Sequence, residues 1–249
     1  MSMQNLVAIV TGSSRGIGKG IAKVFGEEGA RVVVVARSEE EGGRLPGNIH
    51  LTTQEIQEAG GQAMALRCDV TDEEQVQAMA QAVMEAYGRI DVLVNNAGVQ
   101  VNVGLLELQT RHWDLTMRVN LRGPFLCCKH IAPMMVEQRS GNILNITSSA
   151  GENVRPRGIS YAVTKAGLNI MTRGLAQELE EHNIAVNALN PGPVKTEGAV
   201  MVRPSDFDWT NWDPPEVVGV AAAWLAQQTA QSFTGRIVDR TEFGNTWGT

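Results

Sequence analysis

The sequence has few cysteines, no excess of positive charge and no long apolar run, and each shortage disfavours a class of protein. Its three cysteines, Cys68, Cys127 and Cys128, have neither metal-ligand spacing nor a plausible disulfide framework, so we expect reduced thiols, a cytoplasmic protein and no metal site. The net charge of -6 disfavours nucleic acid and anionic membranes as partners, because both attract basic surfaces. All apolar stretches are far shorter than the roughly 20 residues of a bilayer-spanning helix. We therefore expect a soluble protein without a nucleic-acid or membrane partner.

The order of apolar and polar segments predicts the secondary structure. With 43% hydrophobic and 19% charged residues, the 249-residue chain is typical of a folded protein, and we expect residues 1–249 to form a single domain. Short β-branched runs alternate with longer amphipathic segments, and the four consecutive valines of 31–36 are typical of a parallel strand covered on both faces. The expected strands are 6–10, 31–36, 63–68, 92–95, 142–146, 184–189 and 236–239. The expected helices are 17–28, 72–87, 113–138, 160–181 and 215–228.

This alternation predicts an α/β fold of the Rossmann type, a doubly wound seven-stranded parallel sheet flanked by helices. In such sheets ligands bind beyond the carboxyl ends of the strands, so we expect the functional residues in the loops that follow them. Two longer segments interrupt this alternation of strands and helices. We interpret 42–51 as a surface-loop insertion and 192–215, which is rich in Pro, Asp and Trp, as a lid over the ligand crevice.

A glycine-rich turn separates the first expected strand from the first expected helix. At this position backbone amides and the helix dipole can hold a pyrophosphate, and the glycines permit its close approach. The glycine spacing matches neither the G-x-G-x-x-G pattern nor a P-loop, and the glycines alone would also fit an ordinary turn. The residues expected to line this phosphate site are Gly12, Ser13, Ser14, Arg15, Gly16, Ile17 and Gly18.

The second half of the chain carries a pattern of reactive side chains. Tyr161 and Lys165 are four residues apart on an expected helix, which places them on one face. Ser148 ends the fifth expected strand, thirteen residues before Tyr161. A lone Tyr-x-x-x-Lys pair arises by chance on exposed helices. Together with Asn120 and the glycine-rich turn, however, this set resembles the short-chain dehydrogenase/reductase family over almost the whole chain, and is similar to the family's 3-oxoacyl-[acyl-carrier-protein] reductase-like members.

The resemblance implies a catalytic set of Asn120, Ser148, Tyr161 and Lys165. Tyr161 would be the general acid/base. Because a tyrosine with its ordinary pKa of ~10 is a poor acid-base catalyst at neutral pH, we expect the Lys165 ammonium to lower that pKa. The Ser148 hydroxyl would stabilise the developing oxyanion. The resemblance adds that Lys165 contacts the nicotinamide ribose and that Asn120 organises a water-linked proton path.

The family's motifs after the third, fourth and sixth strands imply further cofactor contacts, to the adenine ring, the nicotinamide and the phosphates, although each motif alone would also fit a turn. The residues so assigned, besides Tyr161 and Lys165, are Asp69, Val70, Asn96, Ala97, Gly98, Pro191, Gly192, Val194 and Thr196. One departure matters. Many family members run from the last strand into Asp-Gly-Gly, whereas this chain reads Asp239, Arg240, Thr241, so the family's C-terminal contacts cannot be carried over.

The residues after the second expected strand favour NADP(H) over NAD(H). NAD-selective sites commonly place Asp or Glu there to bind the ribose 2′-hydroxyl, and this chain has Arg37 instead. Arg15 in the glycine-rich turn faces the same ribose, so two guanidinium groups can bracket a 2′-phosphate. The alternative is that Arg37 points into solvent and 39–41 folds back towards the ribose, which would leave NAD(H) as the cofactor.

These observations lead to the hypothesis of an NAD(P)(H)-dependent oxidoreductase that transfers a hydride between the nicotinamide and a small-molecule carbonyl or secondary alcohol. A 3-oxoacyl thioester reductase, a sugar dehydrogenase and a hydroxysteroid dehydrogenase all remain open. A redox-sensing or scaffold protein, which keeps the nucleotide site without turnover, is the alternative from a different class. The intact set of four catalytic residues argues against it. The resemblance also implies a homo-oligomer, a tetramer.

Overall fold

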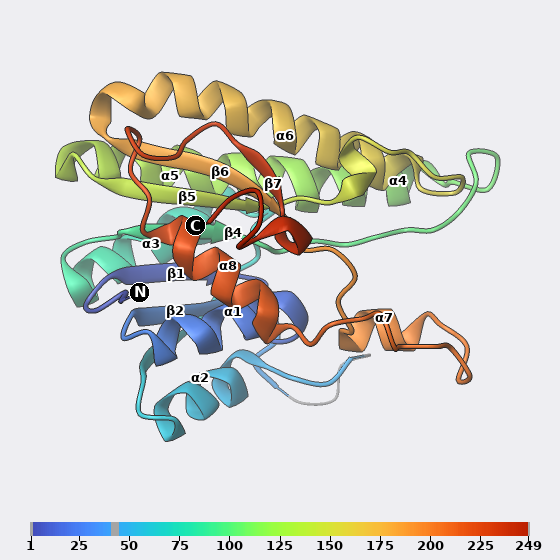
Figure 1. Ribbon diagram of the computed structural model, residues 1–249, viewed down its shortest axis with the longest axis horizontal. Coiled ribbons are helices and arrows are strands. Elements are labelled where there is room, and N and C mark those ends of the chain that lie inside the picture. Colours follow the sequence, from blue (N-terminus) through green and yellow to red (C-terminus); the bar gives the residue numbers. More distant parts are fainter. Residues whose placement is uncertain (1, 41–44, 249) are drawn as a thin grey trace.

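A parallel sheet forms the centre of the protein. The computed structural model describes residues 2–40 and 45–248, and within them seven parallel strands lie in the order β3-β2-β1-β4-β5-β6-β7 (Figure 1). The strands are β1 (Val7–Thr11), β2 (Arg31–Ala36), β3 (Gln62–Arg67), β4 (Val92–Asn95), β5 (Gly141–Ile146), β6 (Ile184–Asn190) and β7 (Ile237–Asp239). The predicted α/β fold with a seven-stranded parallel sheet is confirmed, and each strand begins and ends within one residue of its expected limits.

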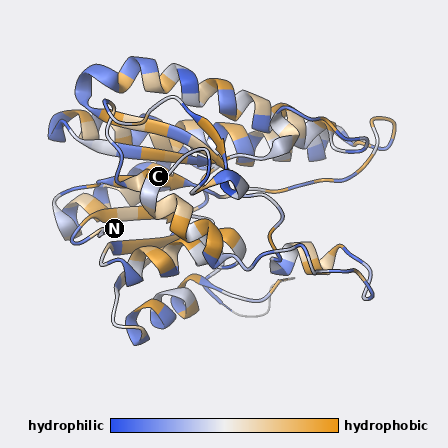
Figure 2. Ribbon diagram, in the orientation of Figure 1, coloured by the Kyte–Doolittle hydropathy of each residue, from blue (hydrophilic) through white to orange (hydrophobic). Residues whose placement is uncertain are grey.

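Helices cover both faces of the sheet. They are α1 (Gly16–Glu27), α2 (Ile49–Glu58), α3 (Glu73–Tyr87), α4 (Thr110–Met117), α5 (Gly123–Gln138), α6 (Ile159–Leu179), α7 (Glu197–Met201) and α8 (Glu216–Ala226). Because strand side chains alternate between faces, Ala8 and Val10 of β1 join the core beneath α1, α2 and α8. Val7 and Ile9 join the core beneath α3, α5 and α6. Figure 2 shows the result, hydrophobic strands between helices with hydrophilic outer faces.

The prediction of a surface loop over 42–51 is wrong at its carboxyl end. Residues 42–44 lie outside the described residues, but Ile49 to Leu51 form the first turn of α2, a helix that the apolar pattern did not indicate. The Asn48 side chain caps this helix by accepting a hydrogen bond from the Leu51 amide at 2.8 Å. Ile49 and Ile56 are its buried apolar anchors, with 1% and 2% exposure. Two isoleucines among polar residues give too weak a periodicity to predict a helix.

The helix expected over 113–138 is interrupted. It begins earlier, with α4 at Thr110, and passes through a widened π-helical turn from Arg118 to Arg122 before α5 begins. Such turns are rare and frequently lie at functional sites. Asn120 is at the centre of this one, so the irregular turn sets the direction of a side chain that belongs to the expected catalytic set.

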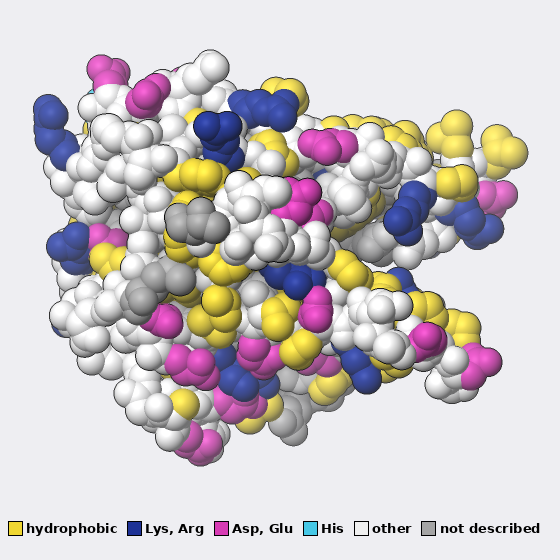
Figure 3. Space-filling model, viewed as in Figure 1, with side chains coloured by type: hydrophobic (Ala, Val, Ile, Leu, Met, Phe, Trp, Pro, Cys, Tyr) yellow, Lys and Arg dark blue, Asp and Glu magenta, His cyan; other side chains and the backbone are white. Residues whose placement is uncertain are grey.

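The segment 192–215 leaves the end of β6 and projects beyond the sheet with the short helix α7 in it (Figure 1). Its two ends are joined at the base, where Val194 and Asp213 form a β-bridge. The loop after β4 projects on the same side of the molecule. Figure 3 shows the surface hollowed between these two projections. Because the sequence predicts that 192–215 is a lid over a ligand crevice, we call this segment the lid. None of the helices that the structure describes is long and apolar enough to cross a membrane.

The tip of the lid is a cluster of aromatic rings around one cation. The Arg203 guanidinium lies 4.3 Å from the ring centre of Trp212 and 4.9 Å from that of Phe207. Trp209 packs edge-on against Trp212 with ring centres 5.3 Å apart. Stacking of a guanidinium on aromatic faces is favourable, so this exposed segment has a small core of its own.

Candidate active site

The glycine-rich turn after β1 is packed so tightly that side chains are excluded from it. Gly12 and Gly16 have φ of 68° and 57°, a conformation that other residues rarely adopt. A Cβ on Gly12 would lie 2.7 Å from Ala97 Cα, and one on Gly18 would lie 2.5 Å from the Gly12 carbonyl oxygen. Within the described chain, the first turn of α1 has neither a side-chain cap nor an acidic residue. The first amides of a helix have no partner within the helix, so here they form a cradle that fits a dinucleotide diphosphate.

Two of the predicted cofactor residues hold the shape of this turn. The buried Ser13 hydroxyl donates to the Val10 carbonyl at 2.6 Å and accepts from the Val35 amide at 2.9 Å. The Asn96 side chain donates to the Thr11 carbonyl at 2.8 Å. These side chains are committed to the protein and position the backbone that would meet the ligand. The other predicted residues of the segments after β1 and β4 lie at the same end of the sheet; they are Ser14, Ile17, Ala97 and Gly98.

Arg37 follows β2, and the Arg15 side chain reaches the same region from the glycine-rich turn after β1, but each has a partner in the protein. Arg15 donates from Nη2 to the Gly47 carbonyl at 2.8 Å and to the Ser38 hydroxyl at 3.2 Å. Arg37, whose side chain is 60% exposed, lies 3.7 Å from a carboxylate oxygen of Asp69. A 2′-phosphate at this position would therefore meet one guanidinium fixed by the backbone and one held loosely.

The expected adenine contacts follow β3. Asp69 accepts hydrogen bonds at 2.9 Å from both the amide and the hydroxyl of Thr71, which fixes its carboxylate at the strand end. Val70 is buried against Gly123, where a Cβ would come within 2.9 Å of the valine side chain. The pair is thus held between the sheet and the amino end of α5.

The Pro-Gly segment after β6 leads directly into the lid. Gly192 has a φ of 69°, which turns the chain away from the strand after Pro191. Val194 is 4% exposed and belongs to the core, while the Thr196 hydroxyl accepts from the Ala199 amide at 3.1 Å and caps α7. Both residues lie where the resemblance implies contacts to the nicotinamide and phosphates.

The first turns of α6 bring Tyr161 and Lys165 beside the end of β5. The Lys165 ammonium is buried, donates to the Ile146 carbonyl at 2.7 Å, and lies 5.4 Å from the centre of the Tyr161 ring. Ser148, two residues beyond Ile146, lies near enough to the Tyr161 hydroxyl to lower its pKa. Three residues that are separate in the sequence therefore lie close together at the carboxyl end of β5.

The expected lowering of the Tyr161 pKa by Lys165 is not found in the structure. Burial raises the pKa of Tyr161, and the nearby Ser148 hydroxyl opposes this only in part. Burial also lowers the pKa of Lys165 to about 8. Desolvation disfavours the charged form of both groups, and the sequence spacing gives no measure of it.

The buried Lys165 ammonium predicts how stability depends on pH. Because its pKa is about 8 in the folded chain and near 10.5 otherwise, the unfolded chain binds more protons in this interval, and the free energy of unfolding rises as pH increases from 8 towards 10. We expect Lys165→Met to lose this contribution. Its stability relative to the natural chain should fall by on the order of 1 kcal/mol per pH unit over this range.

Urea unfolding of both proteins at pH 7, 8, 9 and 10, without cofactor, measures this difference. Taking the difference removes the contributions of the buried cysteines, which are common to both chains. The same substitution at Lys195, an exposed lysine of the lid, is the matched control. A stability difference for Lys165→Met that does not change with pH would contradict the prediction.

Hydrogen bonds with the segment that follows β4 fix the Asn120 side chain. Its side chain accepts from the Val99 amide and donates to the Val99 carbonyl, both at 2.8 Å, and it also reaches the Thr164 hydroxyl at 3.3 Å. With 1% exposure, it links the π-helical turn to α6 one residue before Lys165. The structure thus brings all four expected catalytic residues to the same end of the sheet.

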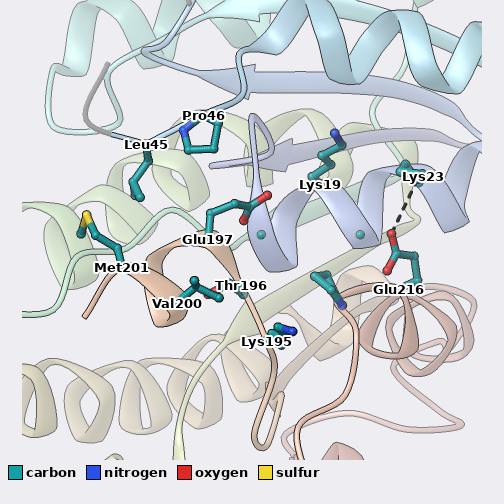
Figure 4. Close-up of a pocket in the computed structure, with 13 residues that line it drawn as sticks. Lys19, Lys23, Leu45, Pro46, Lys195, Thr196, Glu197, Val200, Met201 and Glu216 are labelled. Carbon is teal, nitrogen blue, oxygen red and sulfur yellow. Dashed lines mark ion pairs between the residues drawn. The ribbon is translucent and has the colours of Figure 1, made fainter. Parts of the chain in front are cut away.

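Glu197 was not predicted to belong to the site. It is the first residue of α7, and one carboxylate oxygen is buried without a hydrogen-bond partner in the described part of the chain. This oxygen lies 3.6 Å from where a Cβ on Gly16 would be, and in Figure 4 the side chain points from the lid towards α1. An acidic residue at a helix start is an ordinary capping signal, so sequence alone gave no reason to single it out.

The fold and the side chains at its carboxyl end define a class of protein. An amide cradle for a diphosphate lies at the crevice between β1 and β4, where the order of the strands reverses, and a tyrosine, a serine and a buried lysine lie beyond it at the end of β5. Together these features define an oxidoreductase that acts on CH-OH groups with NAD(P).

Comparison with known proteins gives the family. The family model described as short chain dehydrogenase matches residues 6–206. The chain is 33% identical over 245 residues to the 3-oxoacyl-[acyl-carrier-protein] reductase FabG of Thermotoga maritima, with 96% of this chain and 97% of that protein covered. It is 36% identical over 238 residues to glucose 1-dehydrogenase 2 of Bacillus subtilis, with 92% and 90% covered. A solved metagenomic short-chain oxidoreductase in complex with NADP superposes with a TM-score of 0.81 at 35% identity, covering 96% of this chain and 98% of that one. The chain therefore belongs to the short-chain dehydrogenase/reductase family.

Proposed function

We propose that this protein is an NADP(H)-preferring carbonyl reductase or secondary alcohol dehydrogenase with Asn120, Ser148, Tyr161 and Lys165 as its catalytic set. The observation that carries the proposal is that Tyr161 lies close enough to the Ser148 hydroxyl for that group to lower its pKa, and that the Lys165 ammonium is 5.4 Å from the tyrosine ring centre. A protein that binds the nucleotide without turnover has no need of a buried ammonium, which costs folding stability. The four residues therefore favour an enzyme.

The residues have complementary roles in the reductive direction. Tyr161 donates its phenolic proton to the carbonyl oxygen of the substrate, and the Ser148 hydroxyl donates a hydrogen bond to that oxygen as negative charge develops. The bound nicotinamide nucleotide supplies the hydride. Lys165, held by the Ile146 carbonyl, stabilises the phenolate that remains. In the oxidative direction the same phenolate accepts the alcohol proton.

The proposed cofactor site consists of the glycine-rich turn, the segments that follow β3 and β4, and the Pro-Gly segment after β6. Two observations support a preference for NADP(H). The Arg15 side chain reaches Ser38, the residue after Arg37, so both guanidinium groups belong to the region beyond β2. Glu39, which would have to reach the ribose in the NAD(H) alternative, pairs instead with Arg67 at 3.2 Å. Glu41, which belongs to the same alternative, lies outside the described residues. The NADP complex of the related metagenomic enzyme agrees with this preference.

The preference is tested at Arg37. We expect Arg37→Ala to lower the ratio of kcat/KM for NADPH over NADH by about tenfold, because one charge-assisted contact to the 2′-phosphate is lost. Loss of this cation should leave kcat/KM for NADH nearly unchanged, since NADH has no phosphate there. Steady-state kinetics with both nucleotides and one carbonyl substrate give the ratio.

Arg236→Ala is the matched control for this prediction. Arg236 is also an exposed arginine, but it precedes β7 and therefore lies at the opposite end of the sheet from the expected cofactor site. The control should keep the natural cofactor ratio. A natural protein that prefers NADH, or an unchanged ratio in Arg37→Ala, would assign the phosphate to other residues.

The substrate is best identified by a turnover screen. The relatives named above act on an acyl-carrier-protein thioester and on glucose, so the panel should contain acyl thioesters, sugars, hydroxysteroids, simple ketones and aldehydes. Nicotinamide absorbance reports turnover in either direction. Robust turnover of any member excludes the non-catalytic alternative, whereas nucleotide binding without turnover across the panel supports it.

We further propose that the protein is a homotetramer of the cytoplasm. Phe125 of α5 and Val163 and Ile170 of α6 are 50%, 39% and 65% exposed, which is costly for large apolar side chains unless another subunit covers them. All three cysteines are buried and free, in agreement with a reducing compartment. Light scattering of the purified protein measures the assembly, and a monomer would overturn this part of the proposal.

A further inference from the structure

Arg240 follows β7 directly and lies beneath the base of the lid. Its side chain is only 12% exposed. Nε donates to the Pro191 carbonyl at 3.0 Å, and Nη2 lies 2.7 Å from a carboxylate oxygen of Asp213. One guanidinium thus contacts the chain where it leaves β6 for the lid and again where the lid returns.

The two ends of the lid are joined at this same place. The Lys195 amide donates to the Asp213 carbonyl at 2.8 Å, and the Asp213 amide donates to the Pro193 carbonyl at 3.2 Å. The guanidinium also covers Gly192, because a Cβ on that glycine would lie 3.1 Å from Arg240 Nη2. Arg240 therefore contacts the outgoing and the returning segment at the base of the lid, and also the turn between β6 and the lid.

The backbone that carries Arg240 is fixed from behind. Asp239 accepts from the Thr241 amide at 2.8 Å and from the Asn190 side chain at 2.6 Å, which ties the end of β7 to the end of β6. The Trp247 indole donates to the Asp239 carbonyl at 2.8 Å. An arginine on such a rigid base can transmit its position to the segment that it contacts.

We propose that Arg240 is a positioning residue that holds the Pro191 to Thr196 strip and the base of the lid in their cofactor-binding arrangement before the cofactor arrives. This inference rests on the proposed role of the strip in cofactor binding. A strip that is already ordered loses less conformational freedom on binding, which increases affinity. Arg240 reaches this segment from a position where many family members have glycine, which has no side chain to make these contacts.

The test is Arg240→Ala, studied first without cofactor. Hydrogen exchange at the Lys195 and Asp213 amides should accelerate at least about tenfold, because both bonds across the base open more often. Isothermal titration should give a Kd for NADPH about tenfold weaker. At saturating cofactor, kcat should fall less than about threefold, because the residues around Tyr161 are untouched.

Three further variants separate positioning from a general loss of stability. Arg236→Ala, at the opposite end of β7, removes an exposed arginine and should change neither the exchange nor the Kd. Asp213→Asn should weaken NADPH binding in the natural chain but by less than about twofold in the Arg240→Ala background, since the two residues act as a pair. Arg240→Lys, which keeps the charge but not the forked donor, should recover part of the loss.

Exchange rates and Kd of Arg240→Ala within twofold of the natural chain would overturn the proposal, whatever happens to the melting temperature. Full additivity of the Arg240 and Asp213 substitutions would also overturn it. If the natural chain binds no nucleotide, the proposed function fails. The exchange measurement still decides in that case whether Arg240 holds the base of the lid.

Discussion

Tyr161→Phe should lower turnover by at least about a hundredfold, the scale on which a positioned general acid contributes, and leave cofactor affinity nearly unchanged. Phenylalanine keeps the ring that fills this half-buried site but removes the proton that the carbonyl oxygen must receive. Ser148 and Lys165 have no means of replacing it, because Lys165 is committed to the Ile146 carbonyl. Steady-state kinetics and a nucleotide titration on the same preparation measure both quantities.

The sequence offers one matched control for this substitution. Tyr87, the only other tyrosine, ends α3, and its ring lies 5.9 Å from the Arg31 guanidinium, away from the expected catalytic set. Tyr87→Phe removes the same hydroxyl group and should retain turnover. Near-normal turnover of folded Tyr161→Phe with a good substrate would show that another group supplies the proton.

Gly18→Ala should abolish useful cofactor binding and destabilise the fold. The added Cβ would lie 2.5 Å from the Gly12 carbonyl oxygen and would also collide with the Asn96 side chain. Backbone cannot yield as a flexible side chain can, so we expect a loss of roughly 1–3 kcal/mol in the free energy of unfolding. The displaced Gly12 turn should weaken nucleotide binding by at least about tenfold, because its amides form the diphosphate cradle.

Gly174→Ala provides the opposite expectation within the same protein. Gly174 lies in α6, and a Cβ there would meet nothing within 4 Å among the described residues. Alanine should therefore stabilise the chain by about 0.5–1 kcal/mol through its better helix propensity. Urea unfolding of both variants measures the contrast. Equal stability of the two would show that the glycine-rich turn accommodates a side chain.

The strands and their order of appearance were predictable because most are short apolar runs, such as the four valines of β2, that must be buried on both faces. The helices were less so. α2 depends on Ile49 and Ile56 packing beneath a polar surface, and the π-helical turn around Asn120 depends on contacts with Val99 and Thr164. Such contacts join residues that are distant in the sequence, and the local pattern contains no record of them.

The same distinction holds at the site. Residue types and spacing were enough to bring Ser148, Tyr161 and Lys165 together, because strand ends and helix faces have fixed geometry. Desolvation was not predictable, and it reverses the expected direction of the Tyr161 pKa shift. The sequence identified Arg240 only as a departure from the family pattern. Its function became visible when the structure placed it between two segments that are far from it in the chain.

The aromatic tip of the lid gives this protein an optical reporter of its own. Two of the five tryptophans, Trp209 and Trp212, are in that tip, and the Arg203 cation lies over both rings. Indole emission responds to a nearby charge and to the polarity around the ring, so a rearrangement of the tip changes the native fluorescence without any attached dye. Trp113 and Trp224 lie outside the lid and can be replaced by phenylalanine to reduce the background signal, whereas Trp247 is kept because its indole holds the Asp239 carbonyl. Lid motion can then be followed in real time by stopped-flow mixing with cofactor or substrate.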